Sequence, residues 1–249
     1  MALPAKGPED VPFISVANQH SPTSARAASY GSLRRLCQIA WAALSLVLYF
    51  ADTPAAHAQT QIRIVALGDS LTAGLGLPAN EAFVPRLRAT LAAEGTPAEI
   101  LNAGVSGDTA SGGLARLDWS VPNGTEAVIV ELGANDMLRG VRPQVTRDAL
   151  DALLHRLRER HVAVLLCGTR AAPNLGADYV KSFEAIYPEL AVKYDALLYP
   201  FFLDGVAGRL DLLQPDGLHP NAAGVEVIVR RILPKVEEMI ARARARPPP

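Results

Sequence analysis

IRIVALG, residues 62–68, is a short apolar run that ends at a glycine and is followed directly by polar side chains. Its Ile, Val and Leu residues do not alternate strictly with polar ones, a pattern typical of a strand that is buried on both faces. Similar runs occupy residues 98–104, 127–133, 163–169 and 196–202. We therefore expect five buried strands.

Helical segments lie between these runs and after the last one. Their apolar residues recur at three- and four-residue spacing, which gives each helix one apolar stripe. The stripes are Val84, Leu87 and Leu91; Leu150, Leu153, Leu154 and Leu157; Phe183, Ile186 and Leu190; and Val225, Ile228, Val229, Ile232, Val236 and Ile240. Strands that alternate with helices predict an α/β fold with three layers, α/β/α, in which helices cover both faces of a five-stranded parallel sheet.

The composition favours one globular core and excludes some function classes. The chain has 249 residues, is 49% hydrophobic and carries 24 Lys and Arg against 25 Asp and Glu, a net charge of -1. This balance, without any basic patch interleaved with aromatic residues, argues against a nucleic-acid partner. The two cysteines, Cys37 and Cys167, form no Cys/His cluster at metal spacing, so no metal site is predicted.

The first part of the chain has the order of a secretory signal peptide. Arg34 and Arg35 precede an apolar run at residues 36–51, and Ala56-His57-Ala58 follows as a small-x-small cleavage pattern. We expect residues 1–58 to be a lead and signal peptide and residues 59–249 to be the secreted domain, without a stable membrane span. The alternative is an uncleaved anchor, although the run falls short of the roughly 20 apolar residues that a span needs.

Polar residues cluster where the predicted strands end. Ser70 follows the first strand, Gly104 ends the second, Asn135 follows the third, and Asp216 and His219 lie between the fifth strand and the last helix. Ligands of parallel sheets bind beyond the carboxyl ends of the strands. We therefore expect these residues to meet at one edge of the sheet.

These residue types suit nucleophilic catalysis. A serine hydroxyl such as that of Ser70 needs a neighbouring base, and His219 is the candidate. Asp216 is three residues away in a turn and is the candidate that orients the imidazole. The backbone N–H groups of Ser70 and Gly104 and the side-chain amide of Asn135 are the candidate donors for an oxyanion hole.

These blocks resemble the SGNH or GDSL hydrolase family, whose four named residues match Ser70, Gly104, Asn135 and His219. The resemblance covers about residues 62–240 and is closest to a bacterial periplasmic branch of thioesterases, lysophospholipases and arylesterases. The segments that carry it include Leu114-Ala115-Arg116-Leu117, Val130-Glu131-Leu132-Gly133, Ile186-Tyr187-Pro188 and Asp216-Gly217-Leu218-His219-Pro220-Asn221. It implies a flavodoxin-like sheet, no cofactor, a periplasmic location, and hydrolysis of small acyl esters or thioesters through an acyl-enzyme.

Two other functions are open at this point. An enzyme of the same architecture that removes O-acetyl groups from sugars would need aromatic and polar groups at the rim of its site, whereas the chain is only 6% aromatic. An acyl-chain enzyme needs an apolar groove, for which the candidates are Leu75, Leu77, Phe83, Val141 and Leu175. A non-catalytic binding module should have lost one of the Ser, His and Asp residues.

Overall fold

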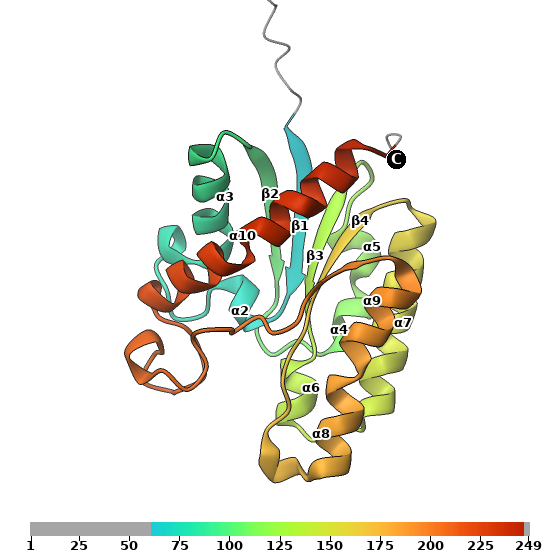
Figure 1. The fold of residues 1–249 in the computed structure, drawn as a ribbon, viewed down its shortest axis with the longest axis vertical. Coiled ribbons are helices and arrows are strands. Elements are labelled where there is room, and N and C mark those ends of the chain that lie inside the picture. The colour runs from blue at the N-terminus through green and yellow to red at the C-terminus, as the bar shows by residue number, and fades with distance from the viewer. Residues whose placement is uncertain (1–60, 247–249) are drawn as a thin grey trace, which may run out of the picture. The chain divides into compact units, whose positions relative to one another are not determined.

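The computed structural model describes residues 61–246, which form one parallel sheet with helices on both faces (Figure 1). The strands lie in the order β2-β1-β3-β4-β5. Their bounds are β1 (Ile62–Gly68), β2 (Ala98–Gly104), β3 (Ala127–Glu131), β4 (Ala163–Cys167) and β5 (Leu197–Tyr199). The predicted α/β architecture is therefore confirmed. The expected boundary between residues 58 and 59 lies outside the described residues.

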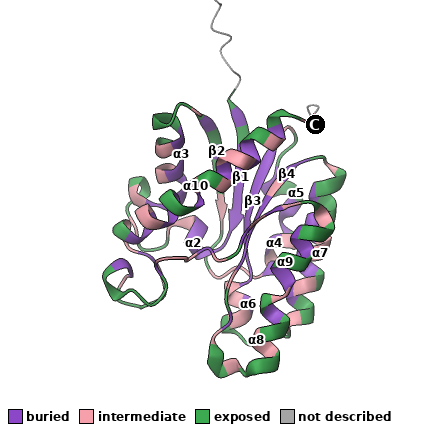
Figure 2. Cartoon of the chain, in the orientation of Figure 1, coloured by how far each residue is buried: buried purple, intermediate pink, exposed green. Residues whose placement is uncertain are grey.

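Two hydrophobic cores lie on opposite faces of the sheet, because successive residues of a strand point to opposite sides. On β1, Ile64 and Ala66 belong to one core, and Val65 and Leu67 belong to the other. The first core is covered by α3 (Phe83–Ala93) and α10 (Ala222–Arg244), and the second by α5 (Leu117–Ser120), α7 (Pro143–Glu159), α8 (Ala177–Glu184) and α9 (Ile186–Tyr194). In Figure 2 the buried strands accordingly run between helices whose outer faces are exposed.

The apolar stripes predicted from spacing are the buried faces of these helices, and all six stripe residues of α10 are buried. One expected helix differs, because Phe183 and Leu190 lie on two helices, α8 and α9, that are separated at Ala185. Pro188, in the first turn of α9, has no N–H to donate to the carbonyl of Glu184, which interrupts the hydrogen-bond ladder there.

Short helices that the periodicity did not reveal begin just beyond the strands. They are α2 (Ser70–Ala73), α4 (Ala110–Ala115) and α6 (Ala134–Leu138), with 3-10 turns at η1 (Ala79–Glu81), η2 (Pro173–Leu175) and η3 (Leu210–Leu212). Side chains that precede a helix cap three of the helices at this edge: Asp69 accepts from the N–H of Leu71, Thr109 from Gly112, and Asn221 from Gly224. Helix starts thus fix the backbone at the carboxyl edge of the sheet.

No helix within residues 61–246 is long and apolar enough to cross a membrane.

Candidate active site

Ser70 is the first residue of α2, directly after β1. The capping contact of Asp69 starts this helix, and Gly74 ends it in a left-handed conformation (φ 83°) with its N–H donated to the Ser70 carbonyl. A helix of one turn between two such signals holds Ser70 rigidly, with 9% of its surface exposed.

His219 and Asp216 reach Ser70 from the loop before α10. The Nε2 atom of His219 lies 2.9 Å from the Oγ of Ser70, and its Nδ1 lies 2.6 Å from the Oδ2 of Asp216. The other oxygen of Asp216 accepts the backbone N–H groups of Leu218 (2.9 Å) and His219 (3.0 Å). One tight turn therefore presents both side chains, as the three-residue spacing predicted.

Asp216 stays ionised over almost the whole pH range. The backbone N–H groups of His219 and Leu218, followed by the imidazole itself, lower the pKa of Asp216 to about 2. A carboxylate that faces Nδ1 favours the tautomer with its proton on that nitrogen. The lone pair of Nε2 is then directed at the hydroxyl of Ser70, and this arrangement can withdraw the hydroxyl proton.

Gln214 connects the loop that carries His219 to the loop that follows α2. Its side-chain amide donates to the carbonyl of Leu75 at 2.8 Å and to that of Pro220 at 2.9 Å. Its backbone N–H donates to the carbonyl of His219 at 2.8 Å. The distance between Ser70 and His219 is thus set by main-chain contacts as well as by their own hydrogen bond.

Asn135 lies on α6, beyond the end of β3. Its Nδ2 donates to the Oδ2 of Asp69 at 3.0 Å, so it sits beside the residue that precedes Ser70. A side-chain amide carries two hydrogens. The contact with Asp69 uses one of them and leaves the other for a second acceptor.

Residues 66–227 match the model of the GDSL-like lipase/acylhydrolase family. The chain belongs to this family. It is 37% identical over 198 residues to Esterase TesA of Pseudomonas aeruginosa, which covers 79% of this chain and 96% of that protein. It is 38% identical over 159 residues to thioesterase 1/protease 1/lysophospholipase L1 of Escherichia coli strain K12, covering 64% and 75% of the two chains.

Among solved structures, the SGNH-family esterase AlinE4 is 48% identical, with a TM-score of 0.61, over 72% of this chain and 96% of that chain. The predicted family and the predicted class of serine ester hydrolase are confirmed by these relatives. In this chain Ser70, Asn135, Asp216 and His219 lie together at the carboxyl edge of the sheet.

The N–H of Gly104, which the sequence suggested as an oxyanion donor, already has a partner in the structure. It donates to the Oδ1 of Asn102 at 2.9 Å. A Cβ at Gly104 would collide with the backbone of Thr72 and Ala73, so the glycine is needed for the close approach of α2 to β2.

Gly107, three residues further along the same loop, presents its backbone differently. It adopts a left-handed conformation (φ 81°), and its N–H has no hydrogen-bond partner among the described residues. Its carbonyl accepts from Nη2 of Arg139 at 2.7 Å, and Arg139 ends the helix that carries Asn135. In the sequence Gly107 is a second glycine of the same polar loop, and spacing alone does not show which of the two glycines offers a free N–H.

Arg116 is a buried cation beneath this GDSL site that the sequence did not single out. It is 7% exposed, and its Nε lies 2.6 Å from the Oδ2 of Asp108. Its Nη1 donates to the carbonyl of Ala103 at 2.8 Å and its Nη2 to that of Gly68 at 2.9 Å. One guanidinium thus joins the ends of β1 and β2 to the loop that contains Gly107, with its five donors in a fixed fork.

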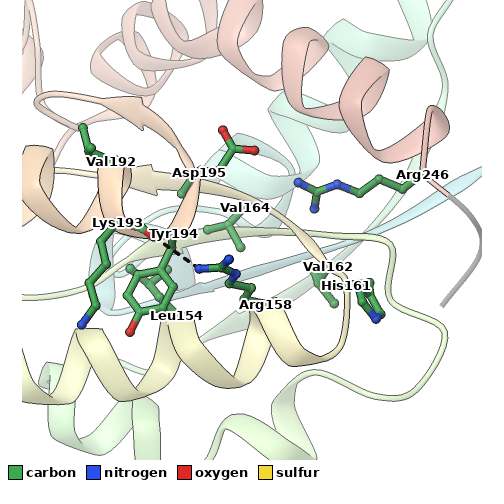
Figure 3. A pocket seen from close by; sticks show the side chains of 11 residues that line it. Leu154, Arg158, His161, Val162, Val164, Val192, Lys193, Tyr194, Asp195 and Arg246 are labelled. Atoms are coloured by element: carbon green, nitrogen blue, oxygen red, sulfur yellow. Dashed lines mark hydrogen bonds between the residues drawn. The ribbon is translucent and has the colours of Figure 1, made fainter.

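A cavity of about 350 Å³ lies at the opposite edge of the sheet, close to the amino ends of β4 and β5 (Figure 3). Arg158, His161, Val164 and Tyr194 are among its lining residues, and no serine or cysteine lines it. It is therefore separate from the hydrolase site. Within the described part of the chain there is also no group of three or more His, Cys, Asp or Glu side chains that could hold a metal ion.

Replacing Arg116 by Met should destabilise the protein strongly, because the Asp108 carboxylate would lose its charge partner in a largely buried position. We expect a loss of about 3 kcal/mol in the free energy of unfolding, measured by urea denaturation. The matched control is Arg156→Met, which breaks the exposed 3.5 Å pair with Asp118 and should cost less than about 1 kcal/mol. Equal losses in the two variants would contradict the role of Arg116.

Proposed function

We propose that this GDSL hydrolase cleaves carboxylic esters or thioesters of acyl chains through an acyl-enzyme formed on Ser70. His219 is the general base and Asp216 orients it. The observation that carries the proposal is the continuous contact from Asp216 through His219 to Ser70, with atoms 2.6 and 2.9 Å apart. These lengths are those of hydrogen bonds along which a proton can move.

In the first half of the reaction the Oγ of Ser70 attacks the acyl carbonyl carbon while its proton passes to Nε2 of His219. The imidazolium formed is stabilised by the ionised Asp216. The tetrahedral intermediate then collapses, and His219 returns the proton to the leaving alcohol or thiol. Water, activated by the same imidazole, releases the acid in the second half and regenerates Ser70.

The oxyanion of each tetrahedral intermediate needs donors beside Ser70. The N–H of Ser70 at the start of α2 has no hydrogen-bond partner among the described residues, and the second amide hydrogen of Asn135 is not used by Asp69. We include the N–H of Gly107 as the third donor in place of Gly104, because the Gly104 N–H is occupied by Asn102. Such donors act mainly on the transition state.

Exposed apolar side chains on the segments that carry the site support an acyl-chain substrate. Leu75, Val105, Leu138 and Leu218 each expose between 43% and 57% of their surface. Leu75, one of the residues expected to line an apolar groove, is among these four. Phe83, another of them, is only 1% exposed and belongs to the hydrophobic core, so it does not line a groove. The word thioesterase in the name of the E. coli relative is consistent with this substrate class.

Removal of O-acetyl groups from sugars is the second candidate. Initial rates on p-nitrophenyl esters from acetate to palmitate, beside an acyl-CoA and an acetylated sugar, separate the two. An acyl-chain enzyme should prefer chains longer than acetate and cleave the acyl-CoA, whereas a preference for the acetylated sugar would favour the second candidate.

We further propose that the enzyme is exported and that residues 59–249 are the mature protein, acting in the bacterial periplasm without an anchor. The support is the order of Arg34, the apolar run 36–51 and Ala56-His57-Ala58. N-terminal sequencing of the protein from a bacterial host should start at Gln59 in the soluble periplasmic fraction. Recovery of residues 36–51 in a membrane fraction would contradict this proposal.

A fluorophosphonate should label Ser70, because it forms a stable adduct only on an activated serine. His219→Ala should abolish both labelling and ester hydrolysis, and Asp216→Asn should damage turnover less, since the imidazole remains while its orientation suffers. Mass spectrometry of the labelled peptide and kcat on a p-nitrophenyl ester are the measurements. Ser106→Ala and Ser111→Ala are the controls, and loss of activity in either, with activity retained in Ser70→Ala, would exclude Ser70 as the nucleophile.

Asn135→Ala should lower kcat by roughly 10²- to 10³-fold with a much smaller change in KM. The reason is that an oxyanion donor binds the developing charge and not the ground-state carbonyl. Steady-state kinetics of the two enzymes on one ester give the comparison. A change confined to KM would assign Asn135 to substrate binding instead.

A further inference from the structure

Two buried carboxyl groups lie directly beneath Ser70. Asp69 is 1% exposed and Glu131 is 2% exposed. Glu131 is the last residue of β3 and pairs in register with Gly68 of β1, so its side chain comes up beside the turn that leads into α2. The hydrolysis mechanism uses neither carboxyl group as an acid or a base.

Glu131 contacts the chain on both sides of the nucleophile. Its Oε2 accepts the backbone N–H of Asp69 at 3.3 Å and the hydroxyl of Thr72 at 2.9 Å. These residues flank Ser70 and Leu71, so one carboxyl group ties both ends of the nucleophile turn to β3. A side chain at Gly68 would collide with the Thr72 and Glu131 side chains, which shows how closely they pack.

Asp69 extends this set of contacts to Asn135. Its Oδ1 accepts the N–H of Leu71 at 3.0 Å and its Oδ2 accepts the amide of Asn135 at 3.0 Å. Asp69 and Glu131 are also close enough that each affects the pKa of the other. The contacts therefore run from Thr72 through Glu131 and Asp69 to the amide that we propose as an oxyanion donor.

Each of two neighbouring buried carboxyl groups disfavours the charge of the other. Burial and the charge of Asp69 raise the pKa of Glu131 well above its ordinary value. Burial also raises the pKa of Asp69, but the Leu71 N–H, Glu131, His219 and Asn135 all act to lower it. Of the two carboxyl groups, Glu131 has the pKa that is raised further, so we place the shared proton on Glu131.

Two further titratable groups close to Glu131 are uncharged. Burial raises the pKa of the Cys167 thiol on β4 and of the Tyr187 phenol on α9 well above their ordinary values. Both groups are therefore neutral at physiological pH. A neutral carboxyl group is the form that suits these surroundings.

We propose that Glu131 is a positioning residue that, as a neutral acid, holds the Asp69 carboxylate in place and through it aims the Asn135 amide at the oxyanion. This inference rests on the donor role of Asn135 in the proposed function. Glu131 does not touch the substrate. Its loss should lower kcat and leave KM nearly unchanged, because the aim of a donor matters most in the transition state.

Two conservative variants of Glu131 separate the length of the side chain from its ability to ionise. In Glu131→Gln the amide oxygen can accept from Thr72 and from the Asp69 N–H, and the NH₂ group can donate to Asp69. This variant should keep kcat within a few-fold of the wild-type value. In Glu131→Asp the carboxyl group is one methylene too short, and kcat should fall at least about tenfold with KM little changed. Labelling to completion with a fluorophosphonate gives the concentration of folded active sites in each variant. Glu94→Gln, at the exposed end of α3, is the matched control.

Infrared spectroscopy in D₂O at neutral pH tests whether the Glu131 carboxyl group is protonated. The wild-type protein and the Glu94→Gln control should show a carbonyl band of a neutral carboxyl group, and Glu131→Gln should lack it. The proposal is overturned if the band persists in Glu131→Gln, if Glu131→Asp keeps the wild-type kcat, or if Glu131→Gln is as damaging as Glu131→Asp.

Asn135→Ala measured in parallel distinguishes this inference from the proposed function. If Asn135→Ala loses kcat while Glu131→Asp does not, the oxyanion donor stands and the role of Glu131 is wrong. If Asn135→Ala keeps kcat, the donor role in the proposed function is wrong, and the inference about Glu131 falls with it.

Discussion

The parallel pairing of β1 with β2 on one side and β3 on the other is the constraint on which the site depends. It sets Gly68 opposite both Gly104 and Glu131, so the segments that follow all three strands leave the sheet at one edge. Ser70 and Asn135 lie on two of these segments, and Gly107 lies on the third. The loop before α10 brings His219 across 149 residues of sequence to this edge, where Gln214 fixes it against the carbonyl of Leu75. The fold thus fixes the relative positions of the proposed nucleophile, base and donors. Such positioning is a main way in which a rigid site lowers a reaction barrier.

Burying charge beneath this edge is costly, and the fold compensates with specific partners. Arg116 is satisfied by Asp108 and by carbonyls at the ends of β1 and β2, so its charge stabilises the backbone that carries the site. Asp69 is satisfied by the Leu71 N–H and by Asn135. The exposed Asp216 has a different task, because a carboxylate with a pKa of about 2 remains an anion beside the imidazole while the reaction proceeds.

Periodicity and strand-end polarity predicted most of this arrangement. Residues 62–68 and 98–104 form strands with the expected bounds, and the spacing of Asp216 and His219 gave the right turn. The later strands end earlier than expected, since a run such as 127–133 does not reveal where it leaves the sheet for α6. The hydrogen bond from the Gly104 N–H to Asn102 could not be predicted, because sequence alone does not say whether a glycine makes room for substrate or for a neighbouring helix. The burial of Arg116 and Glu131 could not be predicted either, since a lone charged residue in a sequence is more often solvated than buried, and only the packing reveals the difference.

In the proposed mechanism, one edge of the sheet stabilises an oxyanion formed on Ser70. The most direct test is a crystal structure of the enzyme after reaction with a phosphonate ester, whose phosphoryl oxygen stands in for the oxyanion of the tetrahedral intermediate. We expect phosphorus bonded to the Oγ of Ser70, with the phosphoryl oxygen about 3 Å from the backbone nitrogens of Ser70 and Gly107 and from the Nδ2 of Asn135. An adduct on another residue, or a phosphoryl oxygen directed away from all three nitrogens into solvent, would contradict it.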